Sequence, residues 1–163
     1  MKKTILGLFL FCSNYLTAQT IPNYDLIKLQ KNTDFKKAEP FVILSANFLL
    51  TTPFKTDSKD RYNSLRFIGQ WMNGTTDYSF IMQDMIEKIG KGDNDHLGIY
   101  VAALSKYTIE NKPVVKNTNQ LKVDAMTTLL NYCQDKNNNL RLTKQLKKFV
   151  EAKEKGQLEQ ALQ

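Results

Sequence analysis

The sequence predicts an all-α fold, a single domain of about six helices in a compact irregular bundle. Apolar residues recur at helical spacing in about six segments, and glycine, proline or Asn-rich turns separate these segments. Period-two alternation, which would indicate strands, is almost absent. Helix centres recur roughly every 20 residues, so a short stack of helical hairpins is the alternative, although no sequence self-similarity accompanies this spacing.

The first helical pattern begins at Asp34 and stops before Pro53. Pro40 fits the first turn of a helix and not its interior, because proline lacks the amide N–H that an interior position donates. A broad apolar face is predicted for Phe41, Val42, Leu44, Phe48 and Leu49.

Two further helices are predicted on either side of Gly74. Asp57 or Ser58 is expected to cap the first of them, and Thr76 or Asp77 the second. The apolar stripe of the first is Tyr62, Leu65, Ile68 and Trp71 or Met72. The stripe of the second is Tyr78, Ile81, Met82, Met85 and Ile89, and it is followed by the stop signals Gly90 and Gly92.

Three helical patterns complete the chain. Asp93 or Asn94 opens the fourth helix, which Pro113 closes, and Asn139 is expected to cap the last long one. The predicted inner residues are Leu97, Tyr100, Val101, Leu104 and Tyr107, then Leu121, Ala125, Leu129, Tyr132 and Cys133, then Leu142, Leu146, Phe149 and Val150. Leu158 and Leu162 are expected in a final short turn.

The start of the chain has the pattern of a secretory signal peptide over residues 1–19, with Lys2 and Lys3 before a short apolar run. Residues 20–32 are expected to form a flexible arm, and residues 33–163 the helical domain. We therefore expect export to the periplasm or the cell exterior, with no stable membrane anchor after signal cleavage. Removing both lysines lowers the net charge from +7 to about +5, and Cys133 remains as the single cysteine.

No constellation of residues predicts catalysis, a metal site or a cofactor. His96 is the only histidine, and Cys133 ends an apolar stripe, so a buried inert thiol is favoured over a nucleophile. Asp135, Asn137 and Asn139 match the first ligands of a calcium loop, but the closing acid is absent. The basic last helix also carries acids, and an exported protein is not expected to bind nucleic acid.

The stretch WMNGTTDYSF, from Trp71 to Phe80, is the best candidate for a binding site. Most of it reads as a turn between two helices, in which Asn73-Gly74 reverses the chain. The excess of polar side chains beside the only tryptophan suggests a site in addition, where a helix N-terminus would attract an anion between aromatic walls. The candidate residues are Trp71, Gly74, Thr75, Thr76, Asp77 and Tyr78.

The end of the signal in Thr-Ala-Gln, the pattern W-x-N-G-T-x-D-Y-x-F, and a Tyr-x-Ala-Ala segment at Tyr100 followed by LLNYC resemble small exported helical proteins of Bacteroidetes. The resemblance covers Ala46 to Lys155. It implies an exported helical protein and transfers no activity and no catalytic residue. Its signature positions would be Gly74, Thr75 and Asp77.

These observations favour a non-catalytic module that binds a protein or a small ligand in a groove between helices. One alternative is a hydrolase that acts on cell-envelope material, which requires His96 or a buried carboxylate in a cleft. The other alternative is a regulatory or toxin-neutralising partner protein of the envelope.

Overall fold

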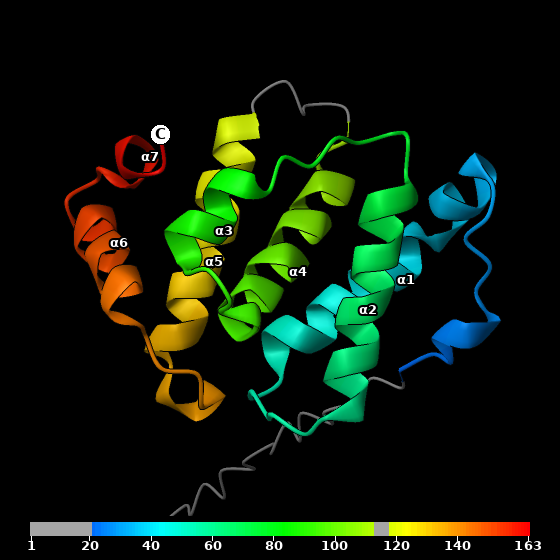
Figure 1. The fold of residues 1–163 in the computed structure, drawn as a ribbon, viewed down its shortest axis with the longest axis horizontal. Helices are drawn as coiled ribbons and strands as arrows, with labels where there is room; N and C mark the ends of the chain where they lie inside the picture. Colours follow the sequence, from blue (N-terminus) through cyan, green and yellow to red (C-terminus); the bar gives the residue numbers. More distant parts are fainter. Residues whose placement is uncertain (1–20, 113–117) are drawn as a thin grey trace, which may run out of the picture.

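The computed structural model describes residues 21–112 and 118–163 (Figure 1). Over these residues the chain forms seven α-helices and two short 3-10 turns, with no β-strand. The helices are α1 (Asn32–Thr51), α2 (Lys59–Gly74), α3 (Gln83–Ile89), α4 (Asn94–Glu110), α5 (Thr118–Gln134), α6 (Lys144–Glu154) and α7 (Leu158–Ala161), and the turns are η1 (Tyr24–Leu26) and η2 (Lys136–Asn138). The predicted all-α bundle is confirmed, and the seventh helix is the short C-terminal turn.

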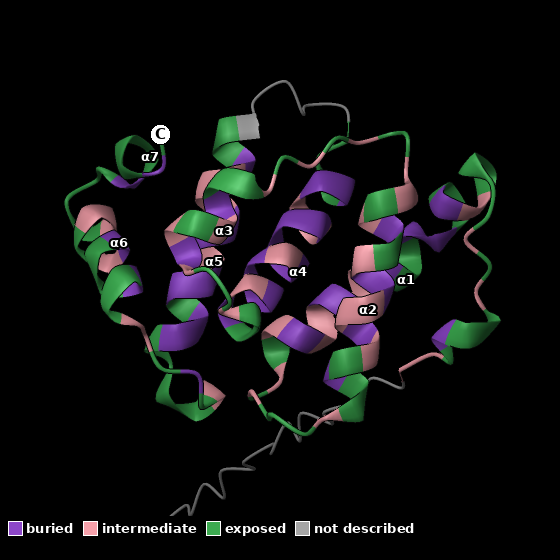
Figure 2. Cartoon of the chain, in the orientation of Figure 1, coloured by how far each residue is buried: buried purple, intermediate pink, exposed green. Residues whose placement is uncertain are grey.

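Helix α4 is the centre of the bundle (Figure 1). Helices α1 and α2 pack against one side of it and α5 against the other, while α6 and α7 cover α5 and α3 contacts α4 and α6. Buried positions therefore occupy most of the circumference of α4, as the purple bands in Figure 2 show. No helix in the described part of the chain is long and apolar enough to cross a membrane.

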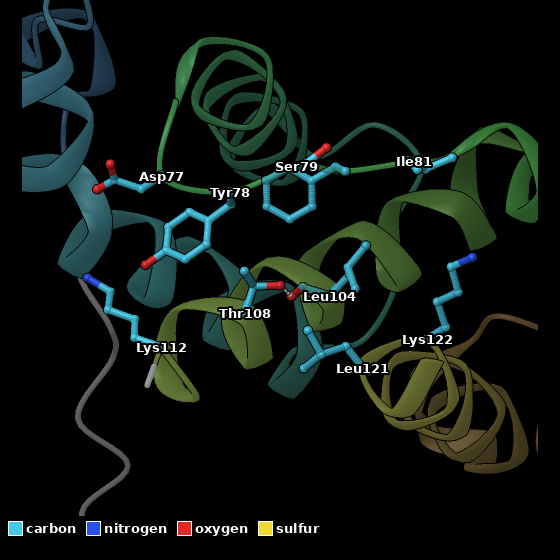
Figure 3. A pocket seen from close by; sticks show the side chains of 10 residues that line it. Asp77, Tyr78, Ser79, Ile81, Leu104, Thr108, Lys112, Leu121 and Lys122 are labelled. Atoms are coloured by element: carbon cyan, nitrogen blue, oxygen red, sulfur yellow. Dashed lines mark hydrogen bonds between the residues drawn. The ribbon is translucent and has the colours of Figure 1, made fainter. Parts of the chain in front are cut away.

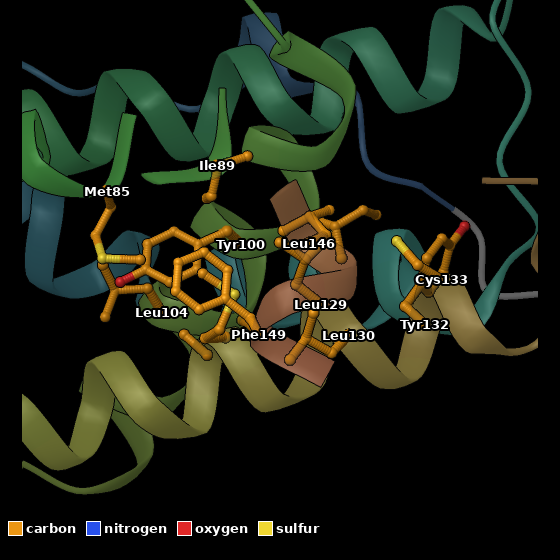
Figure 4. Packing of buried hydrophobic residues seen from close by; sticks show 14 of the residues in the cluster. Met85, Ile89, Tyr100, Leu104, Leu129, Leu130, Tyr132, Cys133, Leu146 and Phe149 are labelled. Carbon is orange, nitrogen blue, oxygen red and sulfur yellow. The ribbon is translucent and has the colours of Figure 1, made fainter. Parts of the chain in front are cut away.

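Two hydrophobic cores lie on opposite sides of α4. The amino-terminal core is built from η1, α1, α2 and α4, and it contains Tyr24, Phe35, Ala38, Val42, Ala46, Leu49, Phe67, Ile68, Trp71, Ala102 and Ile109. The carboxy-terminal core is built from α3 to α7, and its fully buried large side chains include Tyr100, Met126, Leu129 and Leu146 (Figure 4). Each such side chain stabilises the fold by about 1.5–3 kcal/mol relative to an exposed position.

The buried face of α1 differs from the predicted one. Val42 and Leu49 are fully buried as expected, but Phe41 is 38% exposed. The face instead runs from Phe35 through the small residues Ala38 and Ala46. Hydropathy patterns give alanines little weight, although small side chains let neighbouring helices approach closely.

Pro40 lies inside α1, so the expectation that it occupies a first turn was wrong. The helix begins earlier because Asp34 stabilises its start, where the carboxylate accepts hydrogen bonds from the amides of Lys31 and Gln30 at 3.1 and 3.2 Å. These hydrogen bonds lower the pKa of Asp34. Pro40 itself is exposed.

The start of α2 is capped as predicted, because the Ser58 hydroxyl accepts a hydrogen bond from the Arg61 amide. Its stripe was predicted wrongly at one position, since Tyr62 is 69% exposed and Arg61 is buried in its place. The Arg61 guanidinium donates to the carbonyl oxygens of Thr52 and Leu49 at 3.2 and 3.3 Å. A cation thus satisfies carbonyl groups at the C-terminus of α1.

Asp93 caps α4 as predicted, whereas the expected cap of the last long helix was wrong. Thr143 caps α6 by accepting a hydrogen bond from the Leu146 amide at 3.1 Å. Asn139 instead ends η2 in a left-handed conformation, with φ of 58°, which asparagine tolerates better than most residues.

The predicted signal peptide lies outside the described residues. Residues 21–31, expected as part of a flexible arm, pack against the helices. The Tyr24 ring stacks on Phe67 with centroids 4.6 Å apart, and its hydroxyl lies 2.7 Å from that of Ser45 and 3.1 Å from that of Ser64. The buried ring and its hydrogen-bonded hydroxyl thus anchor Tyr24 on α1 and α2.

Candidate functional site

The stretch from Trp71 to Phe80 ends α2 and then crosses the bundle without forming a helix (Figure 1). A helix capped by Thr76 or Asp77 was predicted here, but α3 begins only at Gln83. The local cap residues favour a helix start here. The tertiary contacts of Tyr78 and Phe80 with Trp71 hold the chain in a non-helical path instead. No helix N-terminus is available at Asp77 to attract an anion.

Trp71 and Gly74 both contribute to the packing of α2 against α1. Trp71 is fully buried, and its indole N–H donates to the Phe35 carbonyl oxygen at 3.0 Å. A Cβ atom at Gly74 would lie 2.2 Å from the Phe35 ring, so a side chain cannot be added without a shift of the packing. Neither residue lines the groove described below.

Thr75, Thr76 and Asp77 form a local bend at the end of α2. The Thr75 hydroxyl lies 3.4 Å from the Asp77 amide, from which it accepts a hydrogen bond. Asp77 is exposed, and in Figure 3 its carboxylate points away from the apolar side chains of the groove. Of the six predicted binding residues, Tyr78 and Asp77 line the groove described below, and Gly74 lines a separate hollow between η1 and α2.

Tyr78 connects the crossing segment, residues 75–82, to α1 and to Lys112, which follows the end of α4. Its hydroxyl donates to Glu39 Oε1 at 3.2 Å, and the other oxygen of this buried carboxylate pairs with the Lys112 ammonium. Burial raises the pKa of Tyr78, which keeps its hydroxyl protonated as a donor. Burial acts to lower the pKa of Lys112, but the hydrogen bond and charge of Glu39 raise it overall, so this cation persists.

A groove of about 350 Å³ lies between the crossing segment, the last turns of α4 and the first turns of α5 (Figure 3). Leu104 and Leu121 provide apolar surface between its two ends. Lys112 lies at one end beside Tyr78, and Lys122 lies at the other. The arrangement is suited to an occupant with an apolar body and a negative charge.

The aromatic wall of the groove is held from behind by Trp71. The ring centroid of Trp71 lies 5.6 Å from that of Tyr78 and 5.8 Å from that of Phe80. Tilted pairs at such distances are favourable for aromatic rings. The tryptophan thus supports the site without lining it.

His96 and Cys133 do not form a catalytic dyad. His96 is buried, with Nδ1 2.7 Å from the Asp93 carboxylate and Nε2 2.9 Å from the Arg141 carbonyl oxygen. Burial raises the pKa of Cys133 to about 12, so its thiol is not a nucleophile at neutral pH. Among the described residues, no group of three or more histidine, cysteine and acidic side chains is arranged to hold a metal ion.

Sequence reasoning missed most of the groove. Glu39 carried a signal, because it is an acid inside the apolar face of α1, which indicates a buried and paired carboxylate. Leu104 and Leu121 were predicted as core residues, and nothing in the sequence placed Lys112 and Lys122 at the two ends of one cavity.

Comparison of the chain with protein-family models, with curated proteins and with solved structures finds no match. The resemblance to exported helical proteins of Bacteroidetes therefore stays a prediction.

Proposed function

We propose that the chain is an exported, non-catalytic binding module that holds a ligand or a segment of another protein in the groove beside Tyr78. The observation that carries this proposal is the groove itself, with apolar walls and a lysine at each end. A cavity of about 350 Å³ is within the range that ordinary ligand sites occupy. Export to the periplasm or the cell exterior rests on the signal-peptide pattern of residues 1–19.

A binding role is favoured over hydrolysis by the state of the candidate catalytic groups. Both ring nitrogens of His96 face oxygen atoms of the protein, and His96 does not line the groove. Glu39 is the buried carboxylate that a general-acid mechanism would require. Its two oxygens already accept hydrogen bonds from Lys112 and Tyr78. A regulatory or toxin-neutralising partner would use the same groove, with a protein segment as its occupant.

Anilinonaphthalene sulfonate tests the proposal, because this dye combines an apolar aromatic body with one negative charge. We expect saturable binding of one dye per chain, measured as enhanced dye emission. The double variant Ile81→Asp/Lys122→Glu should weaken binding by about tenfold or more, since it places two carboxylates beside the anion. Both residues are on the surface of the groove, so circular dichroism should show an unchanged fold.

Leu26→Asp is the matched control, because Leu26 is 78% exposed and lies away from the groove, while Ile81 is 70% exposed. The control should bind the dye as the parent chain does. Equal binding by the groove variant, or a dye signal that never saturates, would overturn the proposal.

A further inference from the structure

The crossing segment offers an unused edge of main chain along the groove. From Tyr78 to Met82 the chain makes no turn or bend, and residues 77–81 line the groove. No main-chain N–H or C=O group of residues 78–81 makes a hydrogen bond within the part of the chain that the structure describes. Unpaired main-chain N–H and C=O groups in an extended segment can form hydrogen bonds with a second extended chain that lies beside it.

The side chains of this segment alternate as those of a strand do. Tyr78 and Phe80 are partly buried against Trp71, whereas Ser79 is exposed and Ile81 is 70% exposed. In an extended chain, successive residues direct their main-chain groups to opposite sides. Two of the four residues, either Tyr78 and Phe80 or Ser79 and Ile81, therefore direct both their N–H and their C=O groups toward an incoming chain.

The charge at the end of the groove indicates the chemistry of the occupant. The Lys112 ammonium is neutralised by Glu39. The Lys122 ammonium has no ion pair or hydrogen bond among the described residues, and Asp84 and Glu159, which share a neighbouring hollow with it, lie beyond ion-pair distance. The Lys122 ammonium is thus available to pair with an anionic group of an occupant.

We propose that the groove binds an extended peptide segment that adds as a strand to residues 78–81 and places a carboxylate on Lys122. The inference rests on the proposed binding function and names its partner. Four paired residues span about 13 Å, and apolar side chains of the peptide at every second position would pack on Leu104 and Leu121. A bound helix would leave the main-chain groups of residues 78–81 without partners, because its own N–H and C=O groups are already paired.

The probe is a peptide selected from a displayed library of random ten-residue sequences for binding to the purified chain. We expect enriched peptides that alternate apolar residues and contain an acid. Methylation of one peptide amide at a time should then weaken binding with a period of two, by about tenfold at pairing positions and less than about twofold at the positions between. Peptides that bind without this period would overturn strand addition.

The groove variant Ile81→Asp/Lys122→Glu separates failure of the inference from failure of the function. A peptide can bind the parent chain but not this variant, while its amide methylation shows no two-residue period. That result would leave the binding function intact and overturn strand addition. Peptides that bind the variant as well as the parent chain would remove both. A library without enrichment, together with saturable binding of the dye, would remove the peptide partner alone.

Lys122→Gln tests the carboxylate, with Lys148→Gln on the exposed face of α6 as the matched control. We expect about a tenfold loss of peptide affinity for Lys122→Gln and no change for the control. Amidation of the peptide C-terminus tells a terminal carboxylate from a side-chain carboxylate as the group that Lys122 binds. Equal affinities for the two lysine variants would overturn the assignment of Lys122.

Discussion

The two cores of the molecule are held together in different ways. In the amino-terminal core, buried polar groups link the elements, as the hydroxyl of Tyr24 does with Ser45 and Ser64, and the indole of Trp71 with Phe35. In the carboxy-terminal core, packing of apolar side chains dominates, and the Tyr100 hydroxyl has no partner among the described residues. Directional bonds fix the position of α1 against α2, whereas shape alone fixes much of the packing around α5.

The largest expected change in stability comes from truncating one buried leucine in each core. Leu49→Ala and Leu129→Ala both remove a fully buried side chain, and each should lower the free energy of unfolding by about 2–5 kcal/mol. We expect the larger loss for Leu49→Ala. Hydrogen bonds restrain Tyr24 and Trp71, which lie in the same core as Leu49, whereas Met85 and Met126 are flexible and lie in the same core as Leu129.

Urea denaturation of both variants measures this difference, provided that the slopes of the transitions agree. Equal losses, or a larger loss for Leu129→Ala, would contradict the contrast between a bonded core and an adaptable one.

An intermediate effect is expected from removing one tyrosine hydroxyl in each core. Tyr24→Phe should cost about 1 kcal/mol, because the hydroxyl bonds to two serines. Tyr100→Phe should leave stability unchanged or raise it slightly, since burial without a hydrogen bond disfavours a hydroxyl and also raises the pKa of Tyr100. Denaturation midpoints give the comparison, and a loss for Tyr100→Phe equal to that for Tyr24→Phe would show a partner that the described residues do not supply.

The smallest effect concerns the start of α1, at the edge of the amino-terminal core. Hydrogen bonds from the amides of Lys31 and Gln30 lower the pKa of Asp34 below its unfolded value. The contribution of Asp34 to stability is thus fully present above about pH 4 and is lost as the pH falls through the lowered pKa. The difference in stability between the parent chain and Asp34→Asn should therefore be constant at neutral pH and shrink below about pH 4. Thermal unfolding across this range measures it, and a pH-independent difference would contradict the assignment.

Features set by neighbours in the sequence were predictable. Ser58 and Asp93 cap α2 and α4, and Gly74 ends α2, because each cap depends on residues within one turn. The α5 stripe was also predicted correctly, since its large apolar residues recur at regular spacing.

Features set by distant contacts were not predictable. The buried face of α1 depends on alanines, and the buried Arg61 depends on the end of another helix. The path of residues 75–82 depends on Trp71, and it contradicts the local signals for a helix start. The groove combines three separated segments, so the sequence pointed to Tyr78 and Asp77 but not to the lysines at its ends.

The central position of α4 has a consequence for how this protein can evolve. Leu104 and Thr108 serve the bundle interior and the groove at once, because both are buried and both line the cavity. Ser79, Ile81 and Lys122 line the same cavity but are exposed or only partly buried. We expect selection to hold the first pair nearly constant across descendants of this chain, whereas substitutions in the second set can change which occupant the groove binds without a loss of folding.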